Sequence, residues 1–135
     1  MDLVFLPDDP EGDATLLGLD GDGRVLARRV LHAQAGPSAA AIRARVVVPG
    51  ARVHALWRSL PARQHAHALA AARLALEDHV AGDLATLHVV VEAAGDPSVP
   101  RCILAVAHAT LQAWLAQCDR LGVVPEAMVP DFMLL

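Results

Sequence analysis

The sequence predicts an α/β fold in which helices flank a mixed β-sheet. Short apolar runs, several of them rich in β-branched residues, alternate with two long helical patterns. An Asp-Gly hairpin near the N-terminus indicates antiparallel strands, whereas the apolar run over residues 45–48 is typical of a strand buried on both faces. We therefore expect both strand directions in one layered sheet.

The first three strands are predicted to form a meander. Leu3 to Leu6 is a short apolar strand followed by a loop rich in Pro, Asp and Gly. Residues 15–19 and 24–30 then flank Asp20-Gly21-Asp22-Gly23, whose Asp-Gly pairs favour the positive φ angles of a tight hairpin turn.

The next segment is predicted to contain a short helix and two strands. Ser38 follows a Gly-Pro break and is a suitable N-cap for a helix over residues 39–44. Residues 45–48 are predicted as a strand that turns at Pro49-Gly50, and residues 52–58 alternate between two faces, as in a half-buried strand.

The longest helix is predicted over residues 61–81. Ser59 suits its N-cap, Pro61 its first turn and Gly82 its left-handed stop. Arg73 is expected to pack its stem in the buried stripe and to reach Glu77, whereas Leu74 points away from it. The predicted buried stripe comprises Ala62, His65, Ala66, Leu69, Ala72, Leu76 and Val80.

The remaining elements define the predicted domain organisation. A strand over 87–92, a strand over 101–107 and a helix over 109–121 are followed by an extended tail over 123–135. The helix presents Leu111, Trp114, Leu115, Cys118 and Leu121 on one stripe. The loop over 94–100, with Gly95 and two prolines, is predicted to separate a first subdomain, residues 1–93, from the start of a second, residues 101–135.

Composition excludes several classes of protein. The chain has 135 residues, 55% of them hydrophobic, and a net charge of −4 without basic clusters. We therefore expect an ordered domain that does not bind nucleic acid. No apolar stretch is long enough to cross a bilayer, so we expect this segment to be cytoplasmic and soluble. Cys102 and Cys118 are predicted to be reduced, small apolar side chains.

The sequence predicts no catalytic, cofactor-binding or metal site. Asp20-Gly21-Asp22-Gly23-Arg24 is the nearest approach to a phosphate-binding hairpin, but it lacks a hydroxyl and its second aspartate would repel phosphate. His65 and His67 are two residues apart and so point to different faces of a helix, without a metal-binding motif. The scattered hydroxyls lie in no nucleophile elbow. We therefore expect a protein that is not an enzyme.

A family resemblance extends along most of the chain. The segments are Val46-Val47-Val48-Pro49-Gly50, Leu60-Pro61-Ala62-Arg63, residues 75–83 (Ala-Leu-Glu-Asp-His-Val-Ala-Gly-Asp), Leu87-His88, residues 111–115 and residues 121–130. In this order and spacing they resemble the cytoplasmic region of protein L of the bacterial type II secretion system.

The resemblance implies both a fold and a function. It implies an actin-like ATPase architecture, with which the strand pattern, compatible with a ribonuclease-H-like half, agrees. It also implies a scaffold at the cytoplasmic face of the inner membrane that binds the N-terminal domain of the secretion ATPase, protein E. We expect the chain to be an N-terminal fragment of a single-pass protein whose other parts contact further inner-membrane platform proteins.

The candidate partner-binding residues lie at the end of the long helix and in its exit. An apolar anchor surrounded by carboxylates suits a basic partner surface, although these acids also serve simply to solvate a helix end. Self-association through an exposed strand edge, as a homodimer, is a second possible interface. The predicted contact residues are Leu74, Glu77, Asp78, Asp83 and Leu84.

Two other functions remain open from the sequence. One is a divergent actin-like nucleotide-binding protein, which the defective phosphate hairpin disfavours. The other is a related pilus-assembly scaffold of the same fold, which differs in its peptide partner.

Overall fold

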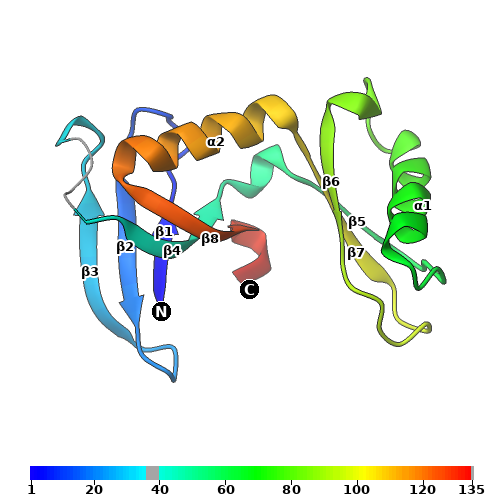
Figure 1. The fold of residues 1–135 in the computed structure, drawn as a ribbon, viewed down its shortest axis with the longest axis horizontal. Coiled ribbons are helices and arrows are strands. Elements are labelled where there is room, and N and C mark those ends of the chain that lie inside the picture. The colour runs from blue at the N-terminus through cyan, green and yellow to red at the C-terminus, as the bar shows by residue number, and fades with distance from the viewer. Residues whose placement is uncertain (36–39, 135) are drawn as a thin grey trace. The chain divides into compact units, whose positions relative to one another are not determined.

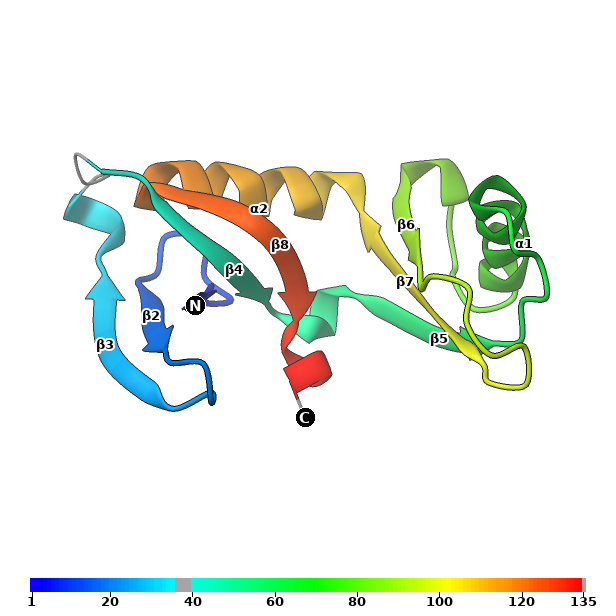
Figure 2. The same cartoon turned by 60° about the horizontal axis from the view of Figure 1, so that its bottom comes forward.

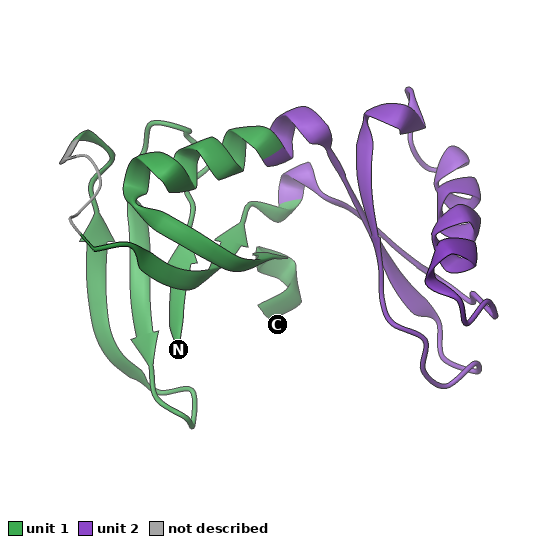
Figure 3. Ribbon diagram, viewed as in Figure 1, with its two compact units in different colours: residues 1–50, 112–135 green, residues 51–111 purple. Residues whose placement is uncertain are grey.

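The chain divides into two compact units. A computed structural model describes residues 1–35 and 40–134. Unit 1 comprises residues 1–50 and 112–135, and unit 2 comprises residues 51–111 (Figure 3). Unit 2 therefore interrupts the sequence of unit 1.

Unit 1 contains a five-stranded mixed sheet. Its strand order is β3-β2-β1-β4-β8, in which β1 pairs antiparallel with β2 and parallel with β4 (Figures 1 and 2). β2 pairs antiparallel with β3, and β4 pairs parallel with β8. This order of strand directions confirms the predicted mixed α/β class. The strands are β1 (Asp2–Phe5), β2 (Ala14–Leu19), β3 (Val25–Leu31), β4 (Ile42–Val48) and β8 (Val123–Pro130).

The predicted hairpin joins β2 to β3. One Oδ1 atom of Asp20 accepts hydrogen bonds from the backbone N–H of Asp22 and of Arg24, each at 2.9 Å. Gly23 adopts a φ of 81°, a value that side-chain-bearing residues rarely reach. The turn is thus stabilised by the residue types that predicted it.

The helix α2 (His108–Leu121) has a buried stripe that differs in part from the predicted one. Trp114, Cys118 and Leu121 are buried as expected. Leu115 is 37% exposed, and Gln117 is buried in its place with its amide nitrogen unpaired among the described residues. The periodicity located the stripe within about one residue position.

The predicted helix over residues 39–44 is wrong where the structure describes it. Ser38 and Ala39 lie outside the described residues, but Ile42 to Ala44 belong to β4. β4 lies between β1 and β8, and Ala44 is 1% exposed within it. Ile42 to Ala44 pair with residues 123–125 of β8, and this pairing outweighs the helical preference of a short alanine-rich segment.

The extended tail predicted over residues 123–135 is confirmed only over Val123–Pro130, which form β8 and pair with β4 from Ile42↔Val123 to Val48↔Pro130. The chain then turns into a short 3₁₀ helix, η4 (Asp131–Leu134). There the Asp131 side chain accepts a hydrogen bond of 3.1 Å from the backbone N–H of Gly50.

Unit 2 contains a three-stranded antiparallel sheet of order β5-β7-β6 and the helix α1. Residues 94–100 connect β6 to β7, which pair with each other. The predicted subdomain boundary therefore falls inside unit 2, because proline and glycine mark a loop without marking what it connects. The elements are β5 (His54–Arg58), α1 (His65–Glu77), the 3₁₀ helix η3 (Leu84–Thr86), β6 (Leu87–Val91) and β7 (Arg101–Ala107).

None of the helices in the described ranges, 1–35 and 40–134, has the length and apolar character required to cross a membrane.

Candidate partner-binding surface

The helix α1 packs on one face of the β5-β7-β6 sheet. Its residues Ala68, Ala72 and Leu76 are at most 1% exposed, and Leu69 and Ala75 are partly buried beside them. The predicted members His65 and Ala66 are exposed. The error arose because α1 is alanine-rich on several sides, so that small differences in docking decide which alanines are buried. The sheet contributes Leu87, Val89, Val91, Ile103 and Ala105 to this core.

The helix begins later than predicted. Gln64, with φ −73° and ψ 133°, is its N-cap residue and makes no side-chain capping hydrogen bond. Ser59 and Pro61 therefore do not start the helix, and residues 60–64 approach it as an extended segment. A side chain of β7 explains why residues 60–64 take this path.

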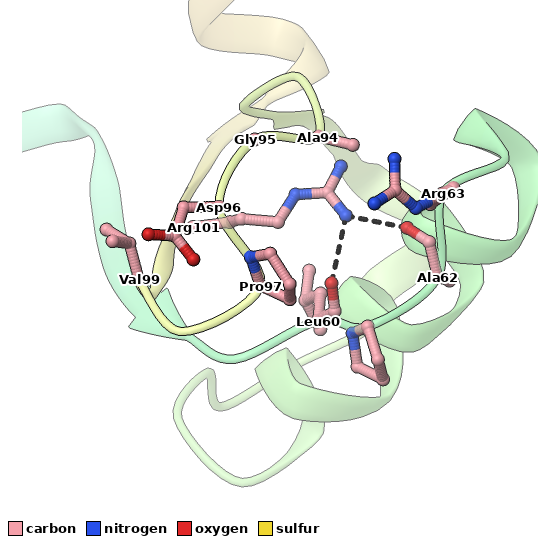
Figure 4. A pocket seen from close by; sticks show the side chains of 10 residues that line it. Leu60, Ala62, Arg63, Ala94, Gly95, Asp96, Pro97, Val99 and Arg101 are labelled. Atoms are coloured by element: carbon pink, nitrogen blue, oxygen red, sulfur yellow. Dashed lines mark hydrogen bonds between the residues drawn. The ribbon is translucent and has the colours of Figure 1, made fainter.

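Arg101, the first residue of β7, holds this segment in place (Figure 4). Its Nη1 donates to the carbonyl oxygens of Leu60 at 3.2 Å and Ala62 at 2.8 Å. Its Nε and Nη2 donate to the carbonyl oxygen of Glu92 at 3.0 and 2.8 Å. The side chain is only 7% exposed, so carbonyl groups replace most of the water around a buried cation. Arg101 thus joins the start of α1 to the β6–β7 loop.

Sequence reasoning missed Arg101 as a positioning residue. The available signal was a single arginine at the start of the otherwise apolar strand Arg-Cys-Ile-Leu-Ala-Val-Ala. A charge in such a strand must lie at an exposed end or find partners, and the structure shows that it finds partners.

Four of the five predicted contact residues are exposed, and three of these four lie on α1 or at its C-cap. Leu74 is 66% exposed on α1, Glu77 is the last residue of the helix, and Asp78 is its C-cap residue. Within the part of the chain that the structure describes, the carboxylates of Glu77 and Asp78 make no hydrogen bond or ion pair. We call Leu74, Glu77 and Asp78 the α1-end surface.

The other two predicted contact residues have structural roles in the exit from the helix. The Asp83 carboxylate caps η3 by accepting from the backbone N–H of Ala85 at 2.9 Å, and the Asp83 carbonyl oxygen accepts from the Thr86 hydroxyl at 2.7 Å. Leu84 packs partly buried against the core of unit 2. Its carbonyl oxygen accepts a 3.5 Å hydrogen bond from Arg73, which corrects the expectation that Arg73 pairs with Glu77.

The chain leaves α1 in a defined conformation. The Nη2 of Arg58 on β5 lies 2.6 Å from the Nε2 of His79, the residue after Asp78. Gly82 has a φ of 121°, but it does not stop the helix as predicted, because α1 already ends at Glu77 with Asp78 as its C-cap residue. The α1-end surface is therefore held between a rigid helix and an exit anchored to the sheet.

At the Asp20 hairpin of unit 1, the backbone N–H groups of Asp22 and Arg24 donate to Oδ1 of Asp20, as described above. Across residues 1–35 and 40–134, no three His, Cys, Asp or Glu side chains gather as they would around a metal ion. Cys102 and Cys118 are free and buried, as predicted, and burial raises the pKa of Cys118 to about 11 and that of Cys102 above its ordinary value.

Comparison with known proteins gives consistent matches. The family model described as type II secretion system (T2SS), protein L, matches residues 22–135. The type II secretion system protein L of Dickeya chrysanthemi is 40% identical over 95 residues, covering 70% of this chain and 23% of that protein. The corresponding protein of Pectobacterium carotovorum subsp. carotovorum is 34% identical over 92 residues, covering 67% and 21%. The chain thus spans less than a quarter of the length of each of these relatives.

A solved structure shares the fold. It is the cytoplasmic domain of EpsL, an inner-membrane component of the type II secretion system of Vibrio cholerae. The TM-score is 0.71 at 17% sequence identity, over 99% of this chain and 58% of that one. The likeness shows that the two chains share one fold.

Proposed function

Because the chain belongs to the type II secretion system protein L family, it is a component of that machinery, and we propose that it is a cytoplasmic adaptor that binds the N-terminal domain of the secretion ATPase, protein E. In this role it couples the ATPase to the inner-membrane platform. The observation that carries the proposal is the α1-end surface, an exposed leucine beside two unpaired carboxylates.

The chemistry of this surface suits a basic partner with an apolar pocket. Leu74 supplies apolar area that becomes favourable only when it is removed from water. Glu77 and Asp78 steer a cationic partner and disfavour acidic ones. Since both carboxylates lack partners in the described part of the chain, binding need not break an existing ion pair.

Rigidity strengthens this assignment. A preorganised surface loses less conformational entropy on binding than a mobile loop. α1 is packed through Ala68, Ala72 and Leu76, and the approach to the helix is held by Arg101. The α1-end surface therefore meets its partner with most of its backbone already ordered.

Titration calorimetry with the N-terminal domain of the matching ATPase tests the proposal. The Leu74→Ala/Asp78→Arg variant removes the anchor and reverses one charge. We expect it to weaken binding by about tenfold or more, because a central anchor and a complementary charge are both lost.

The matched control is Val124→Ala/Glu126→Arg, which makes a comparable change at exposed positions of β8 in unit 1. Binding by this control should equal that of the unaltered chain. Equal binding by all three proteins would move the interface away from α1, and absence of binding by the unaltered chain would contradict recruitment by this segment.

We further propose that the chain is a binding module without catalytic activity. The two backbone hydrogen bonds that Oδ1 of Asp20 accepts within its own turn support this reading, since that oxygen already serves the turn. Magnesium and ATP should leave the melting temperature unchanged, because only a ligand that binds the folded state raises it. A concentration-dependent rise would favour the divergent nucleotide-binding alternative.

A further inference from the structure

The strand β3 is an open edge of the unit 1 sheet. It spans Val25–Leu31 and pairs only with β2 among the described strands, at the outer margin of the sheet (Figures 1 and 2). All of its residues except Leu31 are exposed. Every second residue of an edge strand directs its backbone N–H and C=O groups away from the sheet, where they await a partner.

The side chains of β3 combine apolar area with positive charge. Val25, Leu26 and Val30 are 57%, 71% and 46% exposed. Arg28 and Arg29 lie between them, and neither guanidinium makes a hydrogen bond or ion pair within residues 1–35 and 40–134. The strand thus offers both unpaired cations and apolar contacts.

The register places the two arginines on opposite faces. Arg28 pairs with Leu17, and Arg29 pairs with Leu16. Because adjacent residues of a strand point to opposite faces, a sixth strand beside β3 would meet a positive charge on either side.

We propose that β3 is a docking edge for an extended acidic segment of another protein, which adds to the sheet as a sixth strand. Backbone hydrogen bonds would supply affinity, and the arginines would select acidic side chains. This surface lies in unit 1 and does not depend on the proposed function of the α1-end surface.

Charge disfavours a second copy of this chain as the occupant. Antiparallel pairing of β3 with itself near its centre brings Arg28 and Arg29 of one copy against the same residues of the other. Like charges across adjacent strands are destabilising. The arginines therefore protect the edge from self-pairing and leave it open to an acidic strand.

The test uses two peptides of the same length as β3, one alternating glutamate with valine and the other lysine with valine. Binding to the 135-residue chain is followed by NMR amide shifts and hydrogen exchange. We expect the glutamate peptide to bind saturably and to protect amides of β3, and the lysine peptide not to bind.

Charge reversal supplies the decisive variant. Arg28→Glu/Arg29→Glu should weaken binding of the glutamate peptide by about tenfold. The same variant should bind the lysine peptide, which is a gain that an unfolded variant cannot show. The matched control, Arg43→Glu/Arg45→Glu, alters exposed arginines of β4 and should bind each peptide as the unaltered chain does. The proposal would be overturned if the unaltered chain bound both peptides equally well, or if both variants lost the same affinity for the glutamate peptide. Dimerisation through β3, measured by sedimentation, would also overturn it.

Discussion

Arg101 shows how one side chain determines the local path of unit 2. Its guanidinium uses carbonyl oxygens of Leu60, Ala62 and Glu92 to connect three segments that are distant in sequence. A buried cation of this kind stabilises a specific arrangement, because any other arrangement leaves its donors unpaired.

Replacement of Arg101 should therefore destabilise the protein. Arg101→Met leaves three partly buried carbonyl groups without this donor and is expected to lower the free energy of unfolding by about 2–4 kcal/mol. Arg101→Lys should lose less than Arg101→Met, because an ammonium group can still donate to some of these carbonyl groups, although it cannot reach all three acceptors. Urea denaturation at neutral pH measures both losses.

Arg63→Met is the control for this series. Arg63 lies on the same extended segment but is exposed, and its replacement should change stability by no more than about 0.5 kcal/mol. A similar loss in the Arg63 and Arg101 variants would contradict the role given to Arg101.

Burial of the two thiols also has a measurable consequence. The pKa of Cys118 is about 11 in the folded chain, against an ordinary value of 9.0. Between pH 9 and pH 11 the unfolded state therefore loses a proton that the folded state keeps, so stability falls as pH rises through this window. Cys118→Ala should flatten this part of the pH profile of urea unfolding, and an unchanged profile would contradict it.

At the scale of elements, α1 has an incomplete N-terminus. Its N-cap residue, Gln64, has the extended conformation of a cap but makes no side-chain capping hydrogen bond. A helix that begins this way leaves backbone N–H groups of its first turn without an internal partner.

Gln64→Asp is therefore expected to stabilise the chain by about 0.5–1 kcal/mol, because a short carboxylate reaches the free N–H groups and suits the helix dipole. Thermal unfolding checks the sign. Ser59→Ala serves as control and should have little effect, since Ser59 lies before the extended segment. If Ser59→Ala destabilised the chain and Gln64→Asp had no effect, the helix would start near Ser59, as the sequence predicted.

At the scale of the whole molecule, the two units depend differently on the order of the chain. The buried cluster of unit 2, from Ala68 to Ala105, is built entirely from residues within 51–111. In unit 1, by contrast, β4 pairs with β8, which follows unit 2 in the sequence.

We therefore expect the fragment 51–111 to fold by itself, since its core is internal and domains of this size often fold alone. It should unfold cooperatively in urea and keep the helical circular dichroism of α1. The fragment 1–50, which lacks β8 and α2, should not unfold cooperatively. The opposite result for either fragment would contradict the division into units.

Local patterns determined much of this protein from the sequence alone. The hairpin at Asp20, the strands β1 and β7 and the helix α2 were placed by turn chemistry, β-branched runs and helical periodicity, which act over a few residues. The exposed position of Leu74 also followed from periodicity. The mixed α/β class rested on these same local features, and the family resemblance rested on short motifs such as Leu60-Pro61-Ala62-Arg63.

Only the tertiary structure decided the rest. The start of α1 depends on Arg101, Ile42 to Ala44 became strand because β8 pairs with them, and residues 94–100 connect two strands of one sheet because β6 and β7 pair. Leu84 was withdrawn from the candidate surface by its packing against the core of unit 2. In each case the deciding contact joins residues far apart in sequence or depends on how an element docks, and neither is written in local residue spacing.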